Sequence, residues 1–232
     1  MLFRSEKEAA KEVIFVMDRF GYCKTLDKSI FDRNAESVKN ENIHVMPIMT
    51  DDKICLFTDL GNLHQVKVAD IPAGKVKDKG VPIDNISKFD GAKERILLCC
   101  ASNDLTSKKF LFATEQALVK VVSGEEFVTA NRMVAATKLA DEDKVAVIRL
   151  VEDETEIVLQ SKDGMFLKFS MEEVPLLKKN TRGVRGMKLE KKDTLEQVYL
   201  VGTETVILYK EKEVHLNRLK LAKRDGKGSK RS

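Results

Sequence analysis

The chain has 232 residues, 43% of them apolar and 34% charged, and a formal net charge of +4 at pH 7. This length and apolar content are enough for one large domain or two small domains with a real core, so a peptide-like module is excluded. No apolar run approaches the ~18 residues that a membrane span needs, and the N-terminal sequence lacks the basic-then-apolar order of a signal peptide. We therefore expect a cytoplasmic protein without membrane contact.

Five related hairpin patterns follow one another along the chain. Residues 1–8 are interpreted as the end of a linker, and the hairpins are predicted over residues 11–26, 53–68, 109–122, 156–169 and 206–219. Each pattern has an apolar strand, a polar turn and a second strand. Their turns recur roughly every 40 to 56 residues, the size of a four-stranded propeller blade. These spacings predict an all-β, propeller-like domain of about five four-stranded blades over residues 9–223.

A second pattern follows three of the hairpins: "KGVPIDNI" from Lys79, "RMVAATKL" from Arg132 and "RGVRGMKL" from Arg182. The interval from Gly61 to Gly80 equals that from Gly164 to Gly183, so these loops hold a fixed place in the repeat. An apolar strand follows each, as in "ERILLCCA", "KVAVIRLV" and "LEQVYLVG". Positive charge is concentrated in two segments, residues 178–192 and 218–232, which each carry seven basic residues and one acidic residue.

The strings "GYCKTL", "KGVPIDNI" and "NTRGVRGMKL", at these spacings, resemble the C-terminal domain of the A subunit of bacterial type IIA topoisomerases, DNA gyrase and topoisomerase IV. The resemblance runs from about residue 9 to residue 223. It implies a β-pinwheel, a propeller-like disc whose blades exchange strands, and a basic outer rim that binds and bends double-stranded DNA for strand passage. It also implies an ATP-dependent isomerase whose other parts, the remainder of the A subunit plus the ATPase B subunit, are partners that use ATP and Mg.

One departure from the family pattern concerns the segment after the first "GYCK". Gyrase A subunits carry a glycine-rich basic gyrase box there, whereas this chain has "FDRNAESVKNENIHV" without glycine. The absence of the box indicates a topoisomerase IV-like or weakly wrapping subunit. Residues 224–232, with "DGKGSK", share the glycine and basic character of the box. We expect them to form a flexible basic tail and leave open whether they contact DNA.

Lysine and arginine side chains bind duplex DNA by neutralising phosphates, without reading its sequence. Gly183 and Gly186 are expected to let backbone N–H groups approach a phosphate. The candidate DNA contacts lie in and beside the loops of the second pattern: Lys75, Lys77, Lys79, Arg132, Lys179, Arg182, Arg185 and Lys188.

Catalytic, cofactor and metal sites are not predicted. The strand-cleaving tyrosine of the family follows an arginine, but Tyr22, Tyr199 and Tyr209 do not. The three histidines have no paired spacing, no phosphate-binding motif is present, and the four cysteines fit reduced core thiols better than zinc ligands or disulfides. The alternative function is a protein-binding β-propeller, which the low aromatic content of 6% and the lack of Trp disfavour.

Overall fold

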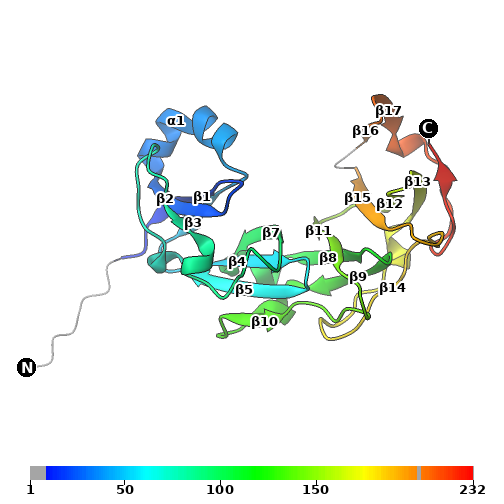
Figure 1. Ribbon diagram of the computed structural model, residues 1–232, viewed down its shortest axis with the longest axis horizontal. Coiled ribbons are helices and arrows are strands. Elements are labelled where there is room, and N and C mark those ends of the chain that lie inside the picture. Colours follow the sequence, from blue (N-terminus) through cyan, green and yellow to red (C-terminus); the bar gives the residue numbers. More distant parts are fainter. Residues whose placement is uncertain (1–8, 203–204, 232) are drawn as a thin grey trace, which may run out of the picture. The chain divides into compact units, whose positions relative to one another are not determined.

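A computed structural model describes residues 9–202 and 205–231 of the chain (Figure 1). These residues contain one α-helix, α1 (Lys28–Glu41), and short 3-10 helices at Val68–Asp70, Ile83–Asn85, Ser102–Ser107, Gly124–Phe127, Met171–Glu173 and Leu216–Arg218. All other regular elements are strands: β1 (Glu12–Met17), β2 (Tyr22–Asp27), β3 (His44–Met49), β4 (Lys53–Thr58), β5 (Asn62–Lys67), β6 (Val81–Pro82), β7 (Ile96–Ala101), β8 (Lys109–Thr114), β9 (Leu118–Ser123), β10 (Met133–Ala135), β11 (Val145–Val151), β12 (Glu156–Ser161), β13 (Met165–Ser170), β14 (Val184–Arg185), β15 (Leu195–Val201), β16 (Val206–Tyr209), β17 (Lys212–His215) and β18 (Ser229–Lys230).

The strands form four four-stranded sheets and a two-stranded sheet. Their orders are β3-β1-β2-β6, β10-β5-β4-β7, β11-β8-β9-β14, β15-β12-β13-β18 and β16-β17. Each sheet is built around one of the five predicted hairpins, so the all-β blade architecture is confirmed. The fifth hairpin remains two-stranded among the described residues, because the one later strand, β18, joins the fourth sheet.

Each four-stranded sheet takes one edge strand from the next repeat. In the first sheet Val81 of β6 pairs with Cys23 of β2, although β6 follows the second hairpin. Val184 of β14 pairs in the same way with Val119. Ser229 of β18 pairs with Phe166, and in the second sheet β10 lies beside β5. The strand exchange implied by the resemblance to the pinwheel fold is therefore present.

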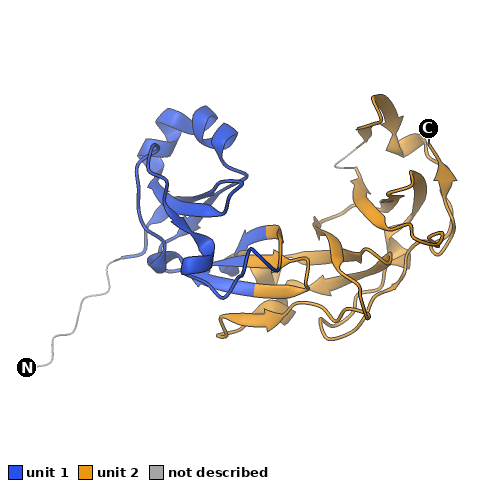
Figure 2. Ribbon diagram, in the orientation of Figure 1, with its two compact units in different colours: residues 1–55, 64–93, 99–103 blue, residues 56–63, 94–98, 104–232 orange. Residues whose placement is uncertain are grey.

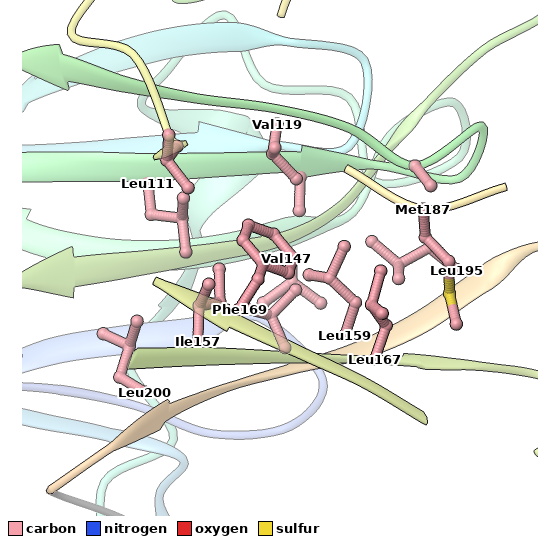
Figure 3. Packing of buried hydrophobic residues seen from close by; sticks show 14 of the residues in the cluster. Leu111, Val119, Val147, Ile157, Leu159, Leu167, Phe169, Met187, Leu195 and Leu200 are labelled. Carbon is pink, nitrogen blue, oxygen red and sulfur yellow. The ribbon is translucent and has the colours of Figure 1, made fainter. Parts of the chain in front are cut away.

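The chain divides into two compact units (Figure 2). Unit 1 consists of residues 1–55, 64–93 and 99–103, and unit 2 of residues 56–63, 94–98 and 104–232. In unit 2 the third and fourth sheets share one apolar core, because alternate strand positions on their facing sides are apolar (Figure 3). Leu111 and Val119 enter this core from the third sheet, and Ile157, Leu159 and Phe169 enter it from the fourth.

In unit 1 helix α1 packs against the first sheet. Val38 is the one fully buried residue of the helix and joins a cluster with Ile14, Val16 and Leu26. Asp27 caps the N-terminus by accepting a hydrogen bond from the backbone N–H of Ser29 at 2.9 Å. The sequence analysis did not predict this helix, because a single buried position gives too weak an apolar period.

Candidate nucleic-acid interface

Four crossover loops connect a hairpin to the sheet that precedes it: residues 72–82, 128–135, 175–188 and 220–231, here crossover loops 1 to 4. Loops 1, 3 and 4 first run parallel to the second hairpin strand of that sheet, where Thr25 bridges Ala73, Val121 bridges Leu176 and Lys168 bridges Leu221. They then turn back and pair antiparallel to the same strand as β6, β14 and β18. The predicted basic residues therefore lie on a recurring element of the fold.

A glycine precedes the exchanged strand in three of these loops, and its backbone lies against a hairpin strand. A Cβ atom on Gly80, Gly183 or Gly228 would lie 2.2 Å, 2.6 Å or 2.6 Å, respectively, from a backbone carbonyl oxygen of that strand. Close packing of two backbones therefore explains the repeated glycine. The expected role of Gly186 is wrong, because its N–H donates to the carbonyl of Ala117 at 2.7 Å and does not serve a phosphate.

Two buried lysines hold the backbones of crossover loops 1 and 3. The ammonium group of Lys120, a residue only 1% exposed, donates to the carbonyl oxygens of Lys178 and Lys179 at 3.1 Å and of Thr181 at 2.7 Å. Lys24, 7% exposed, donates to the carbonyl oxygens of Val76, at 2.7 Å, and of Asp78.

Burial changes the proton affinity of both ammonium groups, because a low-dielectric environment disfavours the charged form. It lowers the pKa of Lys120 to about 8, against an opposing effect of the Glu126 carboxylate. It also lowers the pKa of Lys24, which Asp78 and then Glu41 and Asp18 partly restore.

The predicted DNA contacts differ in how available they are. Seven side chains are exposed: Lys75, Lys77, Lys79, Arg132, Arg182, Arg185 and Lys188. Lys179 is half-buried, and its ammonium group donates to the carbonyl of Glu126 at 2.6 Å. Arg185 forms a bidentate pair with Asp225, in which Nη2 donates to Oδ2 at 2.9 Å. Lys179 and Arg185 thus already have partners within the protein.

The structure joins the two basic segments that are separate in the sequence. Lys188 N donates to the carbonyl of Gly226, and Asp225 N donates to that of Gly186, both at 2.8 Å. The guanidinium of Arg224 donates to the carbonyl of Arg185 at 2.6 Å. Residues 178–192 and 218–231 together carry fourteen basic and two acidic residues. We call the surface formed by these two segments of unit 2 the basic surface.

The expectation of a flexible tail from residue 224 is wrong for residues 224–231. Ser229 and Lys230 form β18 in the fourth sheet, and Arg231 N donates to the carbonyl of Gly164 at 3.0 Å. Sequence polarity suggested a tail because the segment has no apolar run. An edge strand of two residues needs none, because backbone hydrogen bonds and the close approach of Gly228 hold it.

Comparison with protein families agrees with this architecture. The family model of the DNA gyrase C-terminal domain, beta-propeller, matches residues 52–90, 108–152 and 155–201, which together make up more than half of the chain. The chain belongs to this family.

Relatives of the gyrase family share this region. The chain is 27% identical over 195 residues to the A subunit of DNA gyrase from Lawsonia intracellularis, covering 79% of this chain and 24% of that protein. It is 24% identical over 240 residues to the same subunit from Staphylococcus epidermidis (strain ATCC 12228 / FDA PCI 1200), covering 95% and 27%. The chain thus spans about a quarter of the length of these relatives.

Solved structures support the gyrase-type fold. The crystal structure of a DNA topoisomerase IV C-terminal domain has a TM-score of 0.85 at 24% identity, covering 97% of this chain and 73% of that one. The E. coli ParC C-terminal domain has a TM-score of 0.76 at 16% identity, with coverage of 95% and 94%. At these identities the likeness establishes the fold alone.

The gyrase-type repeat contains a signal that the sequence analysis missed. Lys79, Arg132, Arg182 and Lys227 occupy the same place, each one residue before the position of the repeated glycine, and all are exposed. Alignment of Lys227-Gly228 with Lys79-Gly80 and Arg182-Gly183 would have placed residues 227–230 in a fourth crossover loop. Five exposed residues of that loop, all within the basic surface, are therefore added to the candidate DNA contacts: Lys220, Lys223, Lys227, Lys230 and Arg231.

The following two statements hold for residues 9–202 and 205–231. No group of three or more His, Cys, Asp or Glu residues in this part is placed to hold a metal ion. None of the helices described is both long and apolar enough to cross a membrane.

Proposed function

We propose that this chain is the DNA-binding and DNA-bending C-terminal part of the A subunit of a cytoplasmic type IIA topoisomerase. The observation that carries the proposal is the basic surface, where hydrogen bonds between crossover loops 3 and 4 join two strongly basic segments of the sequence. Most of its side chains are exposed and can reach phosphates, whereas Asp225 and Glu190 are paired with Arg185 and Lys227. The ligand is duplex DNA, bound with little sequence preference.

The electrostatics of such a surface suit a bent duplex. Each phosphate that is neutralised releases condensed counterions, so several weak contacts add up to useful affinity. Bending 20 to 30 base pairs by 40 to 90° costs about 1 to 6 kcal/mol. In unit 2 the exposed cations of crossover loops 3 and 4 provide contacts that can offset this cost.

In the whole enzyme this domain would present the duplex for strand passage. Its partners would be the remainder of the A subunit plus the ATPase B subunit, which would use ATP and Mg. The segment at the gyrase-box position supports a topoisomerase IV-like or weakly wrapping subunit. It forms helix α1, which carries Asp32, Glu36 and Glu41 and has no glycine-rich basic loop to hold DNA.

The proposal is tested by titrating fluorescent duplexes of unrelated sequence at several salt concentrations. With roughly five to eight phosphates neutralised, the slope of log K against log[salt] should lie near −5 to −7. Replacing Arg182, Arg185 and Lys188 with Ala should flatten the slope by about two to three units on every sequence. The slope should change by about two units if Asp225 holds Arg185 in the unaltered chain, because Arg185 then neutralises no phosphate there.

The matched control removes three exposed lysines that lie outside the crossover loops: Lys67, Lys88 and Lys93. Equal losses in the two triple variants would mean that affinity reflects diffuse net charge. A slope near zero for the unaltered chain would refute DNA binding by the basic surface. Energy transfer between the two ends of a labelled duplex tests bending separately, and an unchanged end-to-end distance on binding would refute that part.

A further inference from the structure

Lys24 and Lys120 occupy the same position in two different sheets. Lys24 follows Cys23, which pairs with Val81 of the exchanged strand β6. Lys120 follows Val119, which pairs with Val184 of the exchanged strand β14. Each ammonium group is buried and bonded to backbone carbonyls of the crossover loop above it. The arrangement therefore recurs with the repeat.

The fold itself does not require a lysine at this position. The fourth sheet has Leu167 there, and crossover loop 4 passes over it, with the Cβ position of Gly226 3.2 Å from the leucine side chain. An apolar residue thus supports a crossover loop of this kind. Burying an ammonium group is costly compared with burying leucine, so the lysines in the first and third sheets need another explanation.

The backbone carbonyls that accept hydrogen bonds from these lysines suggest that explanation. In crossover loop 3 three of the four carbonyls from Lys178 to Thr181 accept from Lys120, while the side chains of Lys178 and Arg182 are exposed. Carbonyl oxygens carry partial negative charge and would repel a phosphate. Turning them inward leaves the cationic side chains as the groups that an approaching anion meets.

Crossover loop 1 repeats this pattern in unit 1. The carbonyls of Val76 and Asp78 accept from Lys24, and the side chains of Lys75, Lys77 and Lys79 are exposed. Both loops with a lysine beneath them expose several cations, as does crossover loop 4 above Leu167, but only loops 1 and 3 have their carbonyls held inward by an ammonium group.

We propose that Lys24 and Lys120 are positioning residues for DNA binding, each of which fixes a crossover loop so that its cations face the phosphates while the lysine itself never touches DNA. The inference rests on the proposed DNA-binding function and assigns a role to the "GYCK" string and to its equivalent "ALVK". Lys120 is 1% exposed, so any effect of its substitution on DNA binding must pass through the loop.

The protonation state of Lys120 provides an independent probe. The groups that face its ammonium are the three loop carbonyls, Glu126 of the 3-10 helix Gly124–Phe127, and the Phe112 ring of β8, whose centroid lies 5.9 Å away. The ammonium group of Lys179 also lies beside Glu126, because it donates to the Glu126 carbonyl. Above its pKa of about 8 the neutral amine keeps two N–H donors and turns a lone pair toward the third carbonyl, which releases part of the loop.

The experiment compares Lys120→Met and Lys24→Met with Lys168→Met. Lys168 is a matched control, because it is 5% exposed on an equivalent strand but donates to Glu156 at 3.1 Å and to the Asn217 carbonyl at 3.0 Å. Lys120→Met should weaken duplex binding by roughly tenfold and flatten the salt slope by about one to two units. In Lys120→Met the backbone amide hydrogens of residues 178–183 should also exchange faster with solvent. Lys168→Met should change neither duplex binding nor the exchange of these amides.

A second measurement begins with the unaltered chain, so its first result does not depend on the folding of a variant. In the unaltered chain duplex affinity should fall between pH 7 and pH 9, with a midpoint near the Lys120 pKa. Folded Lys120→Met should not show this fall in affinity. The terminal amino group titrates in both chains, so it does not account for a difference between them. Affinity that is flat over this range, or Lys120→Met binding as tightly as the unaltered chain, would overturn the inference. If the unaltered chain does not bind DNA at all, the proposed function fails instead.

Discussion

Replacing Gly183 with Ala tests whether the exchanged strands need a close backbone approach. Gly183 is not among the glycines with positive φ, so alanine is compatible with its backbone conformation. The effect of the substitution therefore depends on the space around the new Cβ atom. The new Cβ would lie 2.6 Å from the oxygen, 2.8 Å from the carbonyl carbon and 2.9 Å from the nitrogen of Val119, all atoms of a central strand. A flexible side chain could rotate away, whereas backbone atoms give way only if a strand shifts or detaches.

Two responses to the added methyl group compete. The strand can shift slightly within the sheet, and overpacking of this kind costs about 1 to 3 kcal/mol. Alternatively β14 can detach, which exposes Met187 at about 1.5 to 3 kcal/mol and breaks the Gly186–Ala117 hydrogen bond at about 0.5 to 1.5 kcal/mol. The shift is cheaper, so we expect Gly183→Ala to lower the free energy of unfolding by about 1 to 3 kcal/mol.

Urea denaturation followed by circular dichroism measures this loss. The control is Gly91→Ala, where φ is also not positive and the nearest atom to the new Cβ is a side-chain oxygen of Asp84 at 3.2 Å. That carboxylate can move, so the control should stay within about 0.5 kcal/mol of the unaltered chain. If Gly183→Ala is as stable as the unaltered chain, or if Gly91→Ala loses as much, the close approach of backbones is not what the repeated glycine serves.

Two further predictions concern crossover loop 4. Asp225→Asn should release Arg185 and raise duplex affinity several-fold, with little change in the unfolding midpoint because the pair is exposed; unchanged affinity in the titration would show that Asp225 does not compete with DNA. Deleting residues 224–232 removes the two ladder pairs of β18 and three backbone hydrogen bonds of Asp225, Gly226 and Arg231, together worth at least about 2 kcal/mol, and should lower the melting temperature by at least about 4 °C. The same deletion should flatten the salt slope by up to about four units, and a melting temperature that does not move would contradict the pairing of β18 with β13.

The hairpins were predictable because each carries its own evidence in the sequence. All five predicted hairpins match paired strands, since an apolar strand, a turn and a second strand are contiguous in the chain. The exchanged strands have two residues each in β6, β14 and β18 and three in β10, too few to show a period of their own. Only the repetition of glycine marks β6, β14 and β18, and the pinwheel fold came from family resemblance.

The candidate site was predictable in composition but not in arrangement. The exposed cations of loops 1 to 3 were named from the sequence, whereas the contact between loops 3 and 4 depends on pairs such as Met187–Gly226, far apart in the chain. Lys120 shows a second limit. Within "LVKVV" a lysine suggests a solvent-facing strand position, but crossover loop 3 covers that face, and sequence spacing does not show what covers a strand.

The exchange of edge strands also determines the order in which this chain can fold. Residues that pair across each exchange, such as Cys23 with Val81 and Phe166 with Ser229, are roughly 60 positions apart, and long loops of this kind slow folding. During synthesis, a sheet whose hairpin has already left the ribosome keeps an open edge until the next repeat emerges. Such an edge can pair with another chain, so we expect translation pauses or chaperone binding between repeats to affect the yield of native protein more than the stability of any one sheet does.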